Sequence, residues 1–419
     1  MKRLKRLLGT LGPGFITGAA DDDPSGIGTY AQTGAQFGFS QLWTVLFAFP
    51  FMVVIQEICG RIGIVTGKGL SGVIKHNYSK KLLYFSVIIL LIANTVNIGA
   101  DLGAMASSAQ LVLGVPFIFL LIGMTILILI LEIFIPYPTY ARFLKYLTLS
   151  LLAYIAVAFI LHLNWINIFK ATIVPHITVS KDYILNIAAL LGTTISPYLF
   201  FWQADEEVEE ELESHKLRFF GKGIPKINKH DIRQMRLDTF IGMFFSQLVT
   251  FFIIISVAAT LGVHGMVNIQ TADQAAIALR PIAGNFAYIL FAAGVIGTGL
   301  LAVPVLAGSA SYAISESLNW KTGLSKKFKQ AHGFYGIITI ATLVGLLVNF
   351  TSIKPFTMLY YTAILNAICA PLLLVFIMII ANNKKIMGNF ANKPVSNILG
   401  WGITIIMSIV AVLTIRSLI

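Results

Sequence analysis

Charged residues are scarce in this sequence of 419 residues. Lysine, arginine, aspartate and glutamate make up 11% of the chain and hydrophobic residues 57%, whereas a soluble domain carries about 25% charged residues. So few charges cannot cover the surface of a soluble protein of this size. Apolar stretches of about 20 residues, enough to cross a bilayer as a helix, recur along the chain. Strand-like alternation between turns is missing. We expect an all-α integral membrane protein.

Cysteine is also rare. The two residues, Cys59 and Cys369, each lie inside an apolar segment, so neither a disulfide framework nor a cysteine-rich metal centre is supported. The seven histidines lie mostly in linkers and show no His-Glu-x-x-His pattern, which removes support for a membrane metalloprotease. Because no nucleophile–base arrangement appears either, we do not expect an enzyme, and no cofactor is implied.

The hydrophobic pattern predicts eleven transmembrane helices. They are expected at 11–38, 42–66, 82–113, 116–136, 143–165, 184–212, 236–262, 272–309, 332–351, 355–382 and 395–418. With a cytoplasmic N-terminus, 25 of the 30 lysines and arginines fall in cytoplasmic segments, as the positive-inside rule requires. The net charge of +12 therefore reflects topology and contact with anionic lipid, and not a nucleic-acid partner. We expect a monomeric multi-pass protein of a prokaryotic plasma (inner) membrane.

The first expected helix is interrupted near its middle. Three consecutive carboxylates at 21–23 precede Pro24, Ser25 and Gly26. Proline removes a backbone donor and clashes with the preceding turn, and glycine permits unusual dihedral angles. Charged side chains at this depth are costly and are retained mainly for function. The alternative is a short helix before the membrane followed by a solvated acidic loop.

The sixth expected helix has a matching interruption at Pro197, which follows Thr193, Thr194 and Ser196. Helices 1 and 6 each begin a set of five spans and enter from opposite sides. This predicts an inverted repeat within a single transport domain, with residues 1–165 and 184–382 as the two halves and 395–418 as an additional helix. Interrupted helices in corresponding positions indicate a transporter site. Unwound carbonyls and Asp23 would supply hard oxygen ligands for a cation.

Motifs along the whole chain resemble the natural-resistance-associated macrophage protein (Nramp) family. They are Gly12-Pro-Gly-Phe with Asp23-Pro-Ser-Gly in helix 1, Arg61-Ile-Gly-Ile-Val-Thr-Gly-Lys-Gly-Leu after helix 2, Asn97-Ile-Gly-Ala-Asp-Leu-Gly-Ala in helix 3, Arg236-Leu-Asp-Thr in helix 7 and Asn397-Ile-Leu-Gly-Trp-Gly in helix 11. The resemblance implies the leucine-transporter fold and divalent-metal transport. Asp23 matches the family's metal-binding aspartate.

The departures from the family's motifs point to a particular ion. Gly26 replaces a ligand asparagine, and Ser196 and Tyr198 replace the methionine and histidine around Pro197. A larger site without the soft methionine sulfur suits Mg²⁺, which dehydrates reluctantly, as in the Nramp-related magnesium transporters; Mn²⁺ comes next. The residues expected at the metal are Asp23 as the first ligand, Asp22 as an outer-shell carboxylate, and Ser196, Ser25, Thr193 and Tyr198.

Proton coupling is expected to be weak or absent. Tyr198 and Gln203 stand at two histidine positions of the family, and tyrosine titrates too high to relay protons near neutral pH. Asp101 matches the family's helix 3 aspartate, but Ala104 replaces the glutamate that follows it.

Asp101, Gln203 and Asp205 are the candidates for the ion path. Asp205 begins an acidic run to residue 211, which would form a cytoplasmic vestibule that concentrates cations. The alternative is a solvated helix end that pairs with the basic linker 215–236. Glu57 and Arg61, four residues apart, indicate a structural ion pair.

Three other functions stay open. One is the proton-coupled Mn²⁺/Fe²⁺ symport implied by the family as a whole. Another is an amine or amino-acid carrier on the same fold, although carboxylates at 21–23 would repel an amino acid's carboxylate. The last is a cation channel, which usually builds one pore from symmetric copies.

Overall fold

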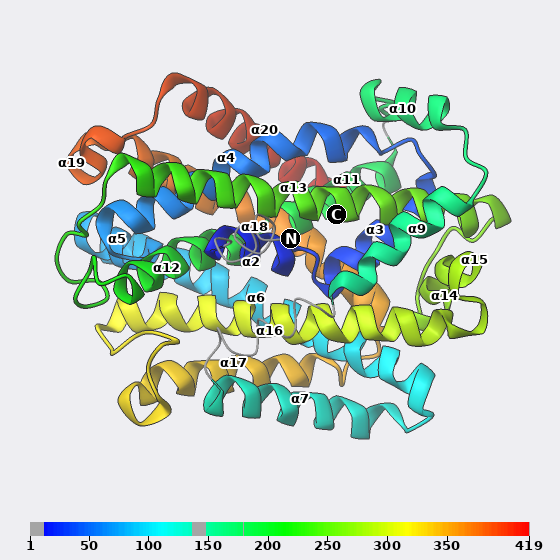
Figure 1. The fold of residues 1–419 in the computed structure, drawn as a ribbon, viewed down its shortest axis with the longest axis horizontal. Helices are drawn as coiled ribbons and strands as arrows, with labels where there is room; N and C mark the ends of the chain where they lie inside the picture. Colours follow the sequence, from blue (N-terminus) through cyan, green and yellow to red (C-terminus); the bar gives the residue numbers. More distant parts are fainter. Residues whose placement is uncertain (1–11, 136–147, 179, 419) are drawn as a thin grey trace, which may run out of the picture.

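The computed structural model describes residues 12–135, 148–178 and 180–418, which form a bundle of long helices lying side by side (Figure 1). The helices are α2 (Pro13–Asp21), α3 (Pro24–Phe37), α4 (Trp43–Thr66), α5 (Leu70–Asn77), α6 (Lys80–Leu113), α7 (Phe117–Phe134), α9 (Leu152–Ile160), α10 (Trp165–Ile173), α11 (Lys181–Thr194), α12 (Pro197–Glu213), α13 (Lys229–Thr260), α14 (Ala272–Ala276), α15 (Arg280–Ala283), α16 (Ala287–Leu318), α17 (His332–Val348), α18 (Pro355–Asn382), α19 (Lys384–Met387) and α20 (Pro394–Leu418). The expected all-α architecture is confirmed.

Eight helical segments of the described chain are long and apolar enough to cross a membrane. The other three expected spans correspond to shorter helices: the α2–α3 pair, α9 and α17. The count of eleven spans, and the division into two repeats, therefore stay predictions. The expected ends at residues 11 and 136 and the start of helix 5 at 143–147 lie outside the described residues.

Three expected helices have wrong boundaries. The seventh helix was expected to begin at 236, but α13 begins at Lys229, because Asn228 caps it there. The eighth helix was expected at 272–309, but the long helix α16 runs from Ala287 to Leu318. The preceding residues form short turns because Pro281 and Gly284, the latter with a φ of +51°, interrupt the helix. The fifth helix ends at Ile160 and not at 165, because Asn164 caps a separate helix, α10.

Both interrupted helices break across two residues. Between α2 and α3 these are Asp22 and Asp23, and between α11 and α12 they are Ile195 and Ser196. A proline follows each break as the first residue of the next helix, and the residue before it is extended, with ψ angles of 172° at Asp23 and 138° at Ser196. Proline disfavours a helical conformation in the residue that precedes it, so the sequence sets both breaks locally.

The first interrupted helix packs closely on α13. A Cβ atom added to Gly18 would lie 2.3 Å from the backbone of Gly242, and one added to Gly242 would lie 2.2 Å from the Gly14 carbonyl oxygen. Only glycine allows two helix backbones to approach this closely. The α2 helix is therefore fixed against α13, while α6 packs against α16, α17 and α18.

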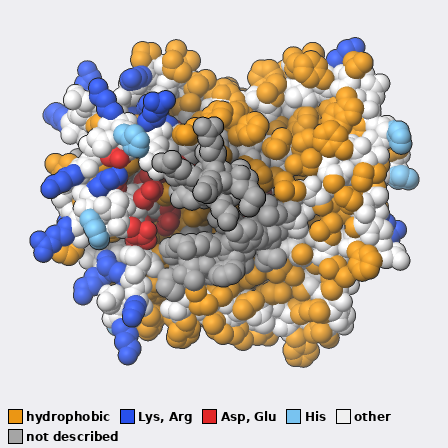
Figure 2. Space-filling model, viewed as in Figure 1, with side chains coloured by type: hydrophobic (Ala, Val, Ile, Leu, Met, Phe, Trp, Pro, Cys, Tyr) orange, Lys and Arg blue, Asp and Glu red, His pale blue; other side chains and the backbone are white. Residues whose placement is uncertain are grey.

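Hydrophobic and charged side chains occupy different parts of the visible surface. Figure 2 shows hydrophobic side chains over the middle and right of the visible face, and most visible lysines and arginines at the left end, around a group of carboxylates. In Figure 1 the same end holds α5, α19 and the last turns of α12. It is the end for which the charge distribution predicts a cytoplasmic location.

Candidate metal site

Asp23 lies between the two interrupted helices and defines the centre of the site. As the N-cap of α3, its Oδ1 accepts hydrogen bonds from the Gly26 backbone N–H and from Ser25 Oγ, both at 2.7 Å. Its Oδ2 accepts a bond from Asn97 Nδ2 of α6 at 3.2 Å. The helix cap thus holds one carboxylate oxygen and directs the other toward α6 and α12.

Oxygen atoms of the second break complete the site. The Tyr198 hydroxyl, in the first turn of α12, lies 3.0 Å from the Ala20 carbonyl oxygen and 3.3 Å from Asp23 Oδ2, and its single proton can serve one acceptor at a time. Thr193 Oγ1, near the end of α11, lies 3.5 Å from Ser25 Oγ. Carboxylate, carbonyl and hydroxyl oxygens from both breaks therefore meet here, and hard cations prefer these ligands.

Asp22 is not brought to this centre. The carboxylates of Asp21 and Asp22 face α13, where Ser246 Oγ donates to Asp21 Oδ2 at 2.6 Å and lies 3.3 Å from Asp22 Oδ1. The unwound backbone therefore sends Asp23 toward α6 and α12 and its two neighbours toward α13. A direct role for Asp22 at the metal stays a prediction.

Ser196 also faces away from Asp23 in this conformation. Its hydroxyl lies 2.8 Å from the Gly192 carbonyl oxygen and 2.7 Å from that of Thr193, and so bonds back along α11. Such bonds satisfy backbone acceptors that the break leaves free. A ligand role for Ser196 would need rotation of its side chain.

Two polar side chains of α6 leave acceptors unpaired next to the site. Asp101 is fully buried near the Ser25 backbone, but neither carboxylate oxygen makes a well-formed hydrogen bond. Asn97 Oδ1 is also buried without a partner. Buried acceptors are costly unless a cation or water satisfies them. The unpaired acceptors thus lie beside the site, and a role for Asp101 in an ion path stays a prediction.

The site is closed to solvent. Asp23, Ser25, Thr193 and Tyr198 are each 1% exposed, and Asn97 is 0% exposed. A cation can enter or leave only if the helices around the breaks rearrange, because no side chain of the centre reaches either surface.

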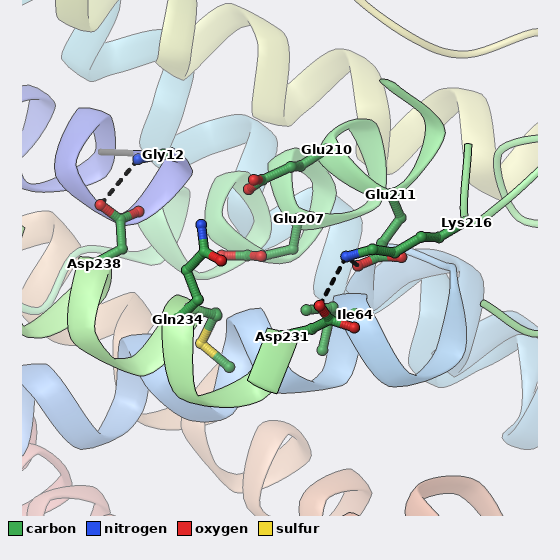
Figure 3. A pocket seen from close by; sticks show the side chains of 10 residues that line it. Gly12, Ile64, Glu207, Glu210, Glu211, Lys216, Asp231, Gln234 and Asp238 are labelled. Atoms are coloured by element: carbon green, nitrogen blue, oxygen red, sulfur yellow. Dashed lines mark hydrogen bonds and ion pairs between the residues drawn. The ribbon is translucent and has the colours of Figure 1, made fainter. Parts of the chain in front are cut away.

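A second acidic region, the acidic vestibule, lies where α12 ends (Figure 3). It surrounds a cavity of about 30 Å³ and contains the carboxylates of Glu207, Glu210, Glu211, Asp231 and Asp238, with the ammonium group of Lys216. Lys216 Nζ lies 3.0 Å from Asp231 and 3.7 Å from Glu211. Burial lowers the pKa of Lys216, but the hydrogen bond to Asp231 and the nearby negative charges outweigh it, so the pKa lies above its usual value.

Asp238 links the acidic vestibule to the first interrupted helix. Its Oδ1 accepts from the Gly12 N–H at 3.0 Å, as Figure 3 shows, and its Oδ2 accepts from the Gly14 N–H at 2.8 Å. These amides have no partner within α2, so a carboxylate of α13 caps the start of α2. If α2 moves, either this contact breaks or α13 moves with α2.

Gln203 and Asp205 lie on different faces of α12. Gln203 Nε2 donates to Glu207 Oε1 at 2.9 Å and so belongs to the acidic vestibule. Asp205 is buried against Gly69, where an added Cβ would lie 1.8 Å from Asp205 Oδ1, and neither of its oxygens has a partner. Glu316 caps the same turn by accepting from the Gly69 N–H at 2.9 Å. The structure does not bring these two predicted ion-path residues together.

Sequence reasoning missed three contributors: Asn97 as a partner of Asp23, Ser246 and Asp238. The spacing of these residues in the sequence did indicate their positions. Asn97 and Asp101 lie four residues apart and share one face of α6. Asp238, Gly242 and Ser246 recur every four residues and form the face of α13 that contacts α2. The predicted Glu57–Arg61 pair is confirmed, with Arg61 Nε 2.9 Å from Glu57 Oε1.

A bundle in which two interrupted helices enclose a buried polar site is the architecture of a membrane transporter with the leucine-transporter fold. The sequence matches the model of the natural resistance-associated macrophage protein-like family over residues 14–417. The chain therefore belongs to the Nramp family.

Known proteins similar to the chain agree with this assignment. The divalent metal cation transporter MntH of Klebsiella pneumoniae is 26% identical over 409 residues, which cover 96% of this chain and 92% of that protein. The Eremococcus coleocola manganese transporter, crystallised with an aromatic bis-isothiourea compound, shares the fold with a TM-score of 0.78 at 16% identity, covering 99% of this chain and 87% of that one. The inward-facing structure of Mhp1 aligns with a TM-score of 0.58 at 13% identity, over 97% of this chain and 90% of that one.

Proposed function

We propose that this protein carries divalent metal cations across the membrane by alternating access, with Mg²⁺ preferred and Mn²⁺ second. The observation that carries the proposal is the Asp23 carboxylate, held by the N-cap of α3 in a closed site at the junction of the two breaks. The Klebsiella relative is named a divalent metal cation transporter, and the Eremococcus structure is that of a manganese transporter. Family membership supports the same class of substrate here.

The preference for Mg²⁺ rests on the groups that surround Asp23. Its side-chain partners are hydroxyl groups and one carboxamide, and Gly26 supplies only a backbone N–H. A site without a thioether or a second carboxamide offers few direct ligands. Mg²⁺ keeps several of its water molecules when it binds, so it needs fewer direct ligands from the protein.

Weak or absent proton coupling is part of the proposal. Tyr198 is the hydroxyl next to Asp23, and a phenol does not titrate near neutral pH. The seven histidines all lie at helix ends or in the segments between the long helices, away from Asp23. An imidazole that could relay protons at neutral pH is therefore missing beside the ion.

The test is uptake of Mg²⁺, Mn²⁺, Ca²⁺ and Zn²⁺ by the purified protein in liposomes. Asp23→Asn removes the negative charge, and we expect uptake of every transported ion to fall by about tenfold or more. The matched control is Asp182→Asn, which changes an exposed aspartate at the start of α11. Unchanged uptake by the Asp23 variant would refute the site, and internal acidification in proportion to metal uptake would refute weak coupling.

A further inference from the structure

A second cavity lies at the end of the bundle where α4 ends and α13 and α20 begin. Its volume is about 320 Å³. Five basic side chains line it: Arg61, Lys229, Arg233, Arg236 and Lys393. None of its described lining residues is acidic. We call this cavity the basic pocket.

Two of the five cations are fixed and build the wall of the pocket. Arg61 binds Glu57 through two hydrogen bonds, of 2.9 and 3.1 Å, and Arg236 Nε donates to the same carboxylate at 2.7 Å. Arg61 also donates to the Phe390 carbonyl oxygen and, at 2.7 Å, to Asn392 Oδ1 in the segment before α20. One glutamate cannot neutralise two guanidinium groups, so this wall keeps a positive charge.

The other three cations are uncompensated. Lys229, Arg233 and Lys393 have exposed side chains that make no ion pair with any described residue. They come from the start of α13 and the residue before α20, and they face one cavity. Like charges gathered in this way repel one another, and an anion with several oxygen atoms would bind them.

The surface that continues from the pocket along the bundle is apolar. Leu237 of α13 is 58% exposed, and Val395 and Ile398 of α20 are 68% and 72% exposed. Both helices begin at the pocket, α13 runs along most of the bundle while α20 ends near its middle (Figure 1), and α4 packs against both. An apolar helix surface with a basic pocket at one end has the chemistry of a phospholipid site.

We propose that the basic pocket binds the phosphate headgroup of an anionic phospholipid, whose acyl chains lie against the exposed apolar side chains of α13 and α20. The bound lipid connects α4, α13 and the segment before α20. Since α13 also carries Asp238 and Ser246, which contact α2, the lipid fixes the helix against which the first interrupted helix is held. The proposal does not depend on which ion the protein transports.

The test uses the purified full chain in a neutral detergent, with the melting temperature measured against added phosphatidylglycerol, phosphatidylcholine or inorganic phosphate. We expect phosphatidylglycerol alone to raise the melting temperature. In Arg233→Gln/Lys393→Gln the half-saturating lipid concentration should rise by about tenfold or more, because each removed cation weakens attraction to an anionic lipid. Each single variant should give an intermediate shift, so the result does not depend on the double variant folding.

The matched control is Lys321→Gln/Lys329→Gln, which removes two exposed cations of the linker between α16 and α17, outside the pocket. It should respond to phosphatidylglycerol as the unmodified protein does. An unchanged response in the pocket variants would overturn the proposal. An equal shift with inorganic phosphate would assign the pocket to a soluble phosphate anion instead, and an equal shift with phosphatidylcholine would rule out recognition of charge.

Discussion

At the scale of single residues, three neighbouring aspartates have two different tasks. On a continuous helix successive side chains point about 100° apart. Here the backbone unwinds, with ψ angles of 48° at Asp22 and 172° at Asp23. Asp23 can therefore cap α3 and present its Oδ2 to the site, while Asp21 and Asp22 are anchored to Ser246. Of the three carboxylates, that of Asp23 reaches the Tyr198 hydroxyl beyond the second break.

The first prediction concerns ion preference. Gly26→Asn introduces a carboxamide next to Asp23, and the new Cβ would lie 3.2 Å from Tyr30 Oη and 3.3 Å from the Asp21 carbonyl oxygen, so a small shift of Tyr30 admits it. An added direct ligand favours an ion that sheds its water readily. We expect the ratio of Mn²⁺ to Mg²⁺ uptake in liposomes to rise by roughly tenfold.

Gly26→Ala is the control for this change, because it adds the same Cβ without a ligand. It should leave the ratio near that of the unmodified protein. If both variants shifted the ratio equally, packing and not ligation would control selectivity.

A second prediction concerns Lys216, which occupies the acidic vestibule as an internal cation. Because the pKa of Lys216 is raised, its ammonium group stays charged below the ordinary lysine value, so its ion pair with Asp231 should not change between about pH 6 and pH 9. In Lys216→Gln, Glu211 and Asp231 become free to attract cations. We expect the half-saturating cation concentration on that side to fall about two- to fivefold, and less at high salt.

The control for Lys216 is Lys222→Gln, an exposed lysine of the same linker that forms no ion pair with a described residue. Its affinity for cations should match that of the unmodified protein. A Lys216 variant with unchanged or weaker affinity would show that the vestibule is only a solvated helix end.

At the scale of elements, α2 is held at both ends and along its length. Asp238 caps its first amides, Ser246 binds the aspartates at its last turn, and glycine contacts join it to α13 in between. The shorter half of the first interrupted helix thus moves with α13 unless these contacts break. Opening of the site toward the acidic vestibule requires separation of α2 and α13 from α12, or of α2 from α13.

The glycine contact gives a prediction for stability. In Gly18→Ala the new methyl group would lie 2.3 Å from the backbone of Gly242, so the two helices must move apart. We expect a loss of at least about 2 kcal/mol in stability, because backbone cannot yield as a side chain does. The measurement is the melting temperature of the purified protein, compared with Gly123→Ala on α7, where nothing lies within 4 Å of the added atom. Equal melting temperatures would contradict the close packing of α2 and α13.

At the scale of the whole molecule, the closed site lies within the bundle, and the acidic vestibule and the basic pocket lie at one end. The visible lysines and arginines gather around that end in Figure 2, with carboxylates between them. Basic residues at the rim suit an anionic membrane surface, and acidic residues in the vestibule suit a cation leaving or entering the site.

The fourth prediction concerns the orientation of the protein in the membrane. Lys321→Cys and Lys170→Cys place thiols at exposed positions of two linkers expected on opposite sides. The native Cys59 and Cys369 are buried and add little background. In intact cells a membrane-impermeant maleimide should label position 170 at once and position 321 only after permeabilisation. The reverse pattern would invert the assigned topology.

The sequence alone determined the features that depend on local chemistry. Hydrophobic length predicted the membrane helices, Pro24 and Pro197 set the breaks because proline acts on its own and the preceding residue, and the four-residue spacing predicted the Glu57–Arg61 pair. The motif also predicted Asp23 as the central ligand, which the structure places between the two breaks. The start of the eighth helix was misplaced because the hydrophobic sequence continues through the interruptions at Pro281 and Gly284.

Only the tertiary structure decided where the polar side chains point. Asp22 lies in the same break as Asp23, yet it faces Ser246. Ser196 lies in the second break, yet its hydroxyl bonds to carbonyl oxygens of α11. Gln203 and Asp205 are two residues apart, but Gln203 bonds to Glu207 of its own helix and Asp205 is buried against Gly69 before α5. These directions depend on the dihedral angles of unwound residues and on partners distant in the chain. Sequence spacing describes neighbours along one helix, and it does not carry that information.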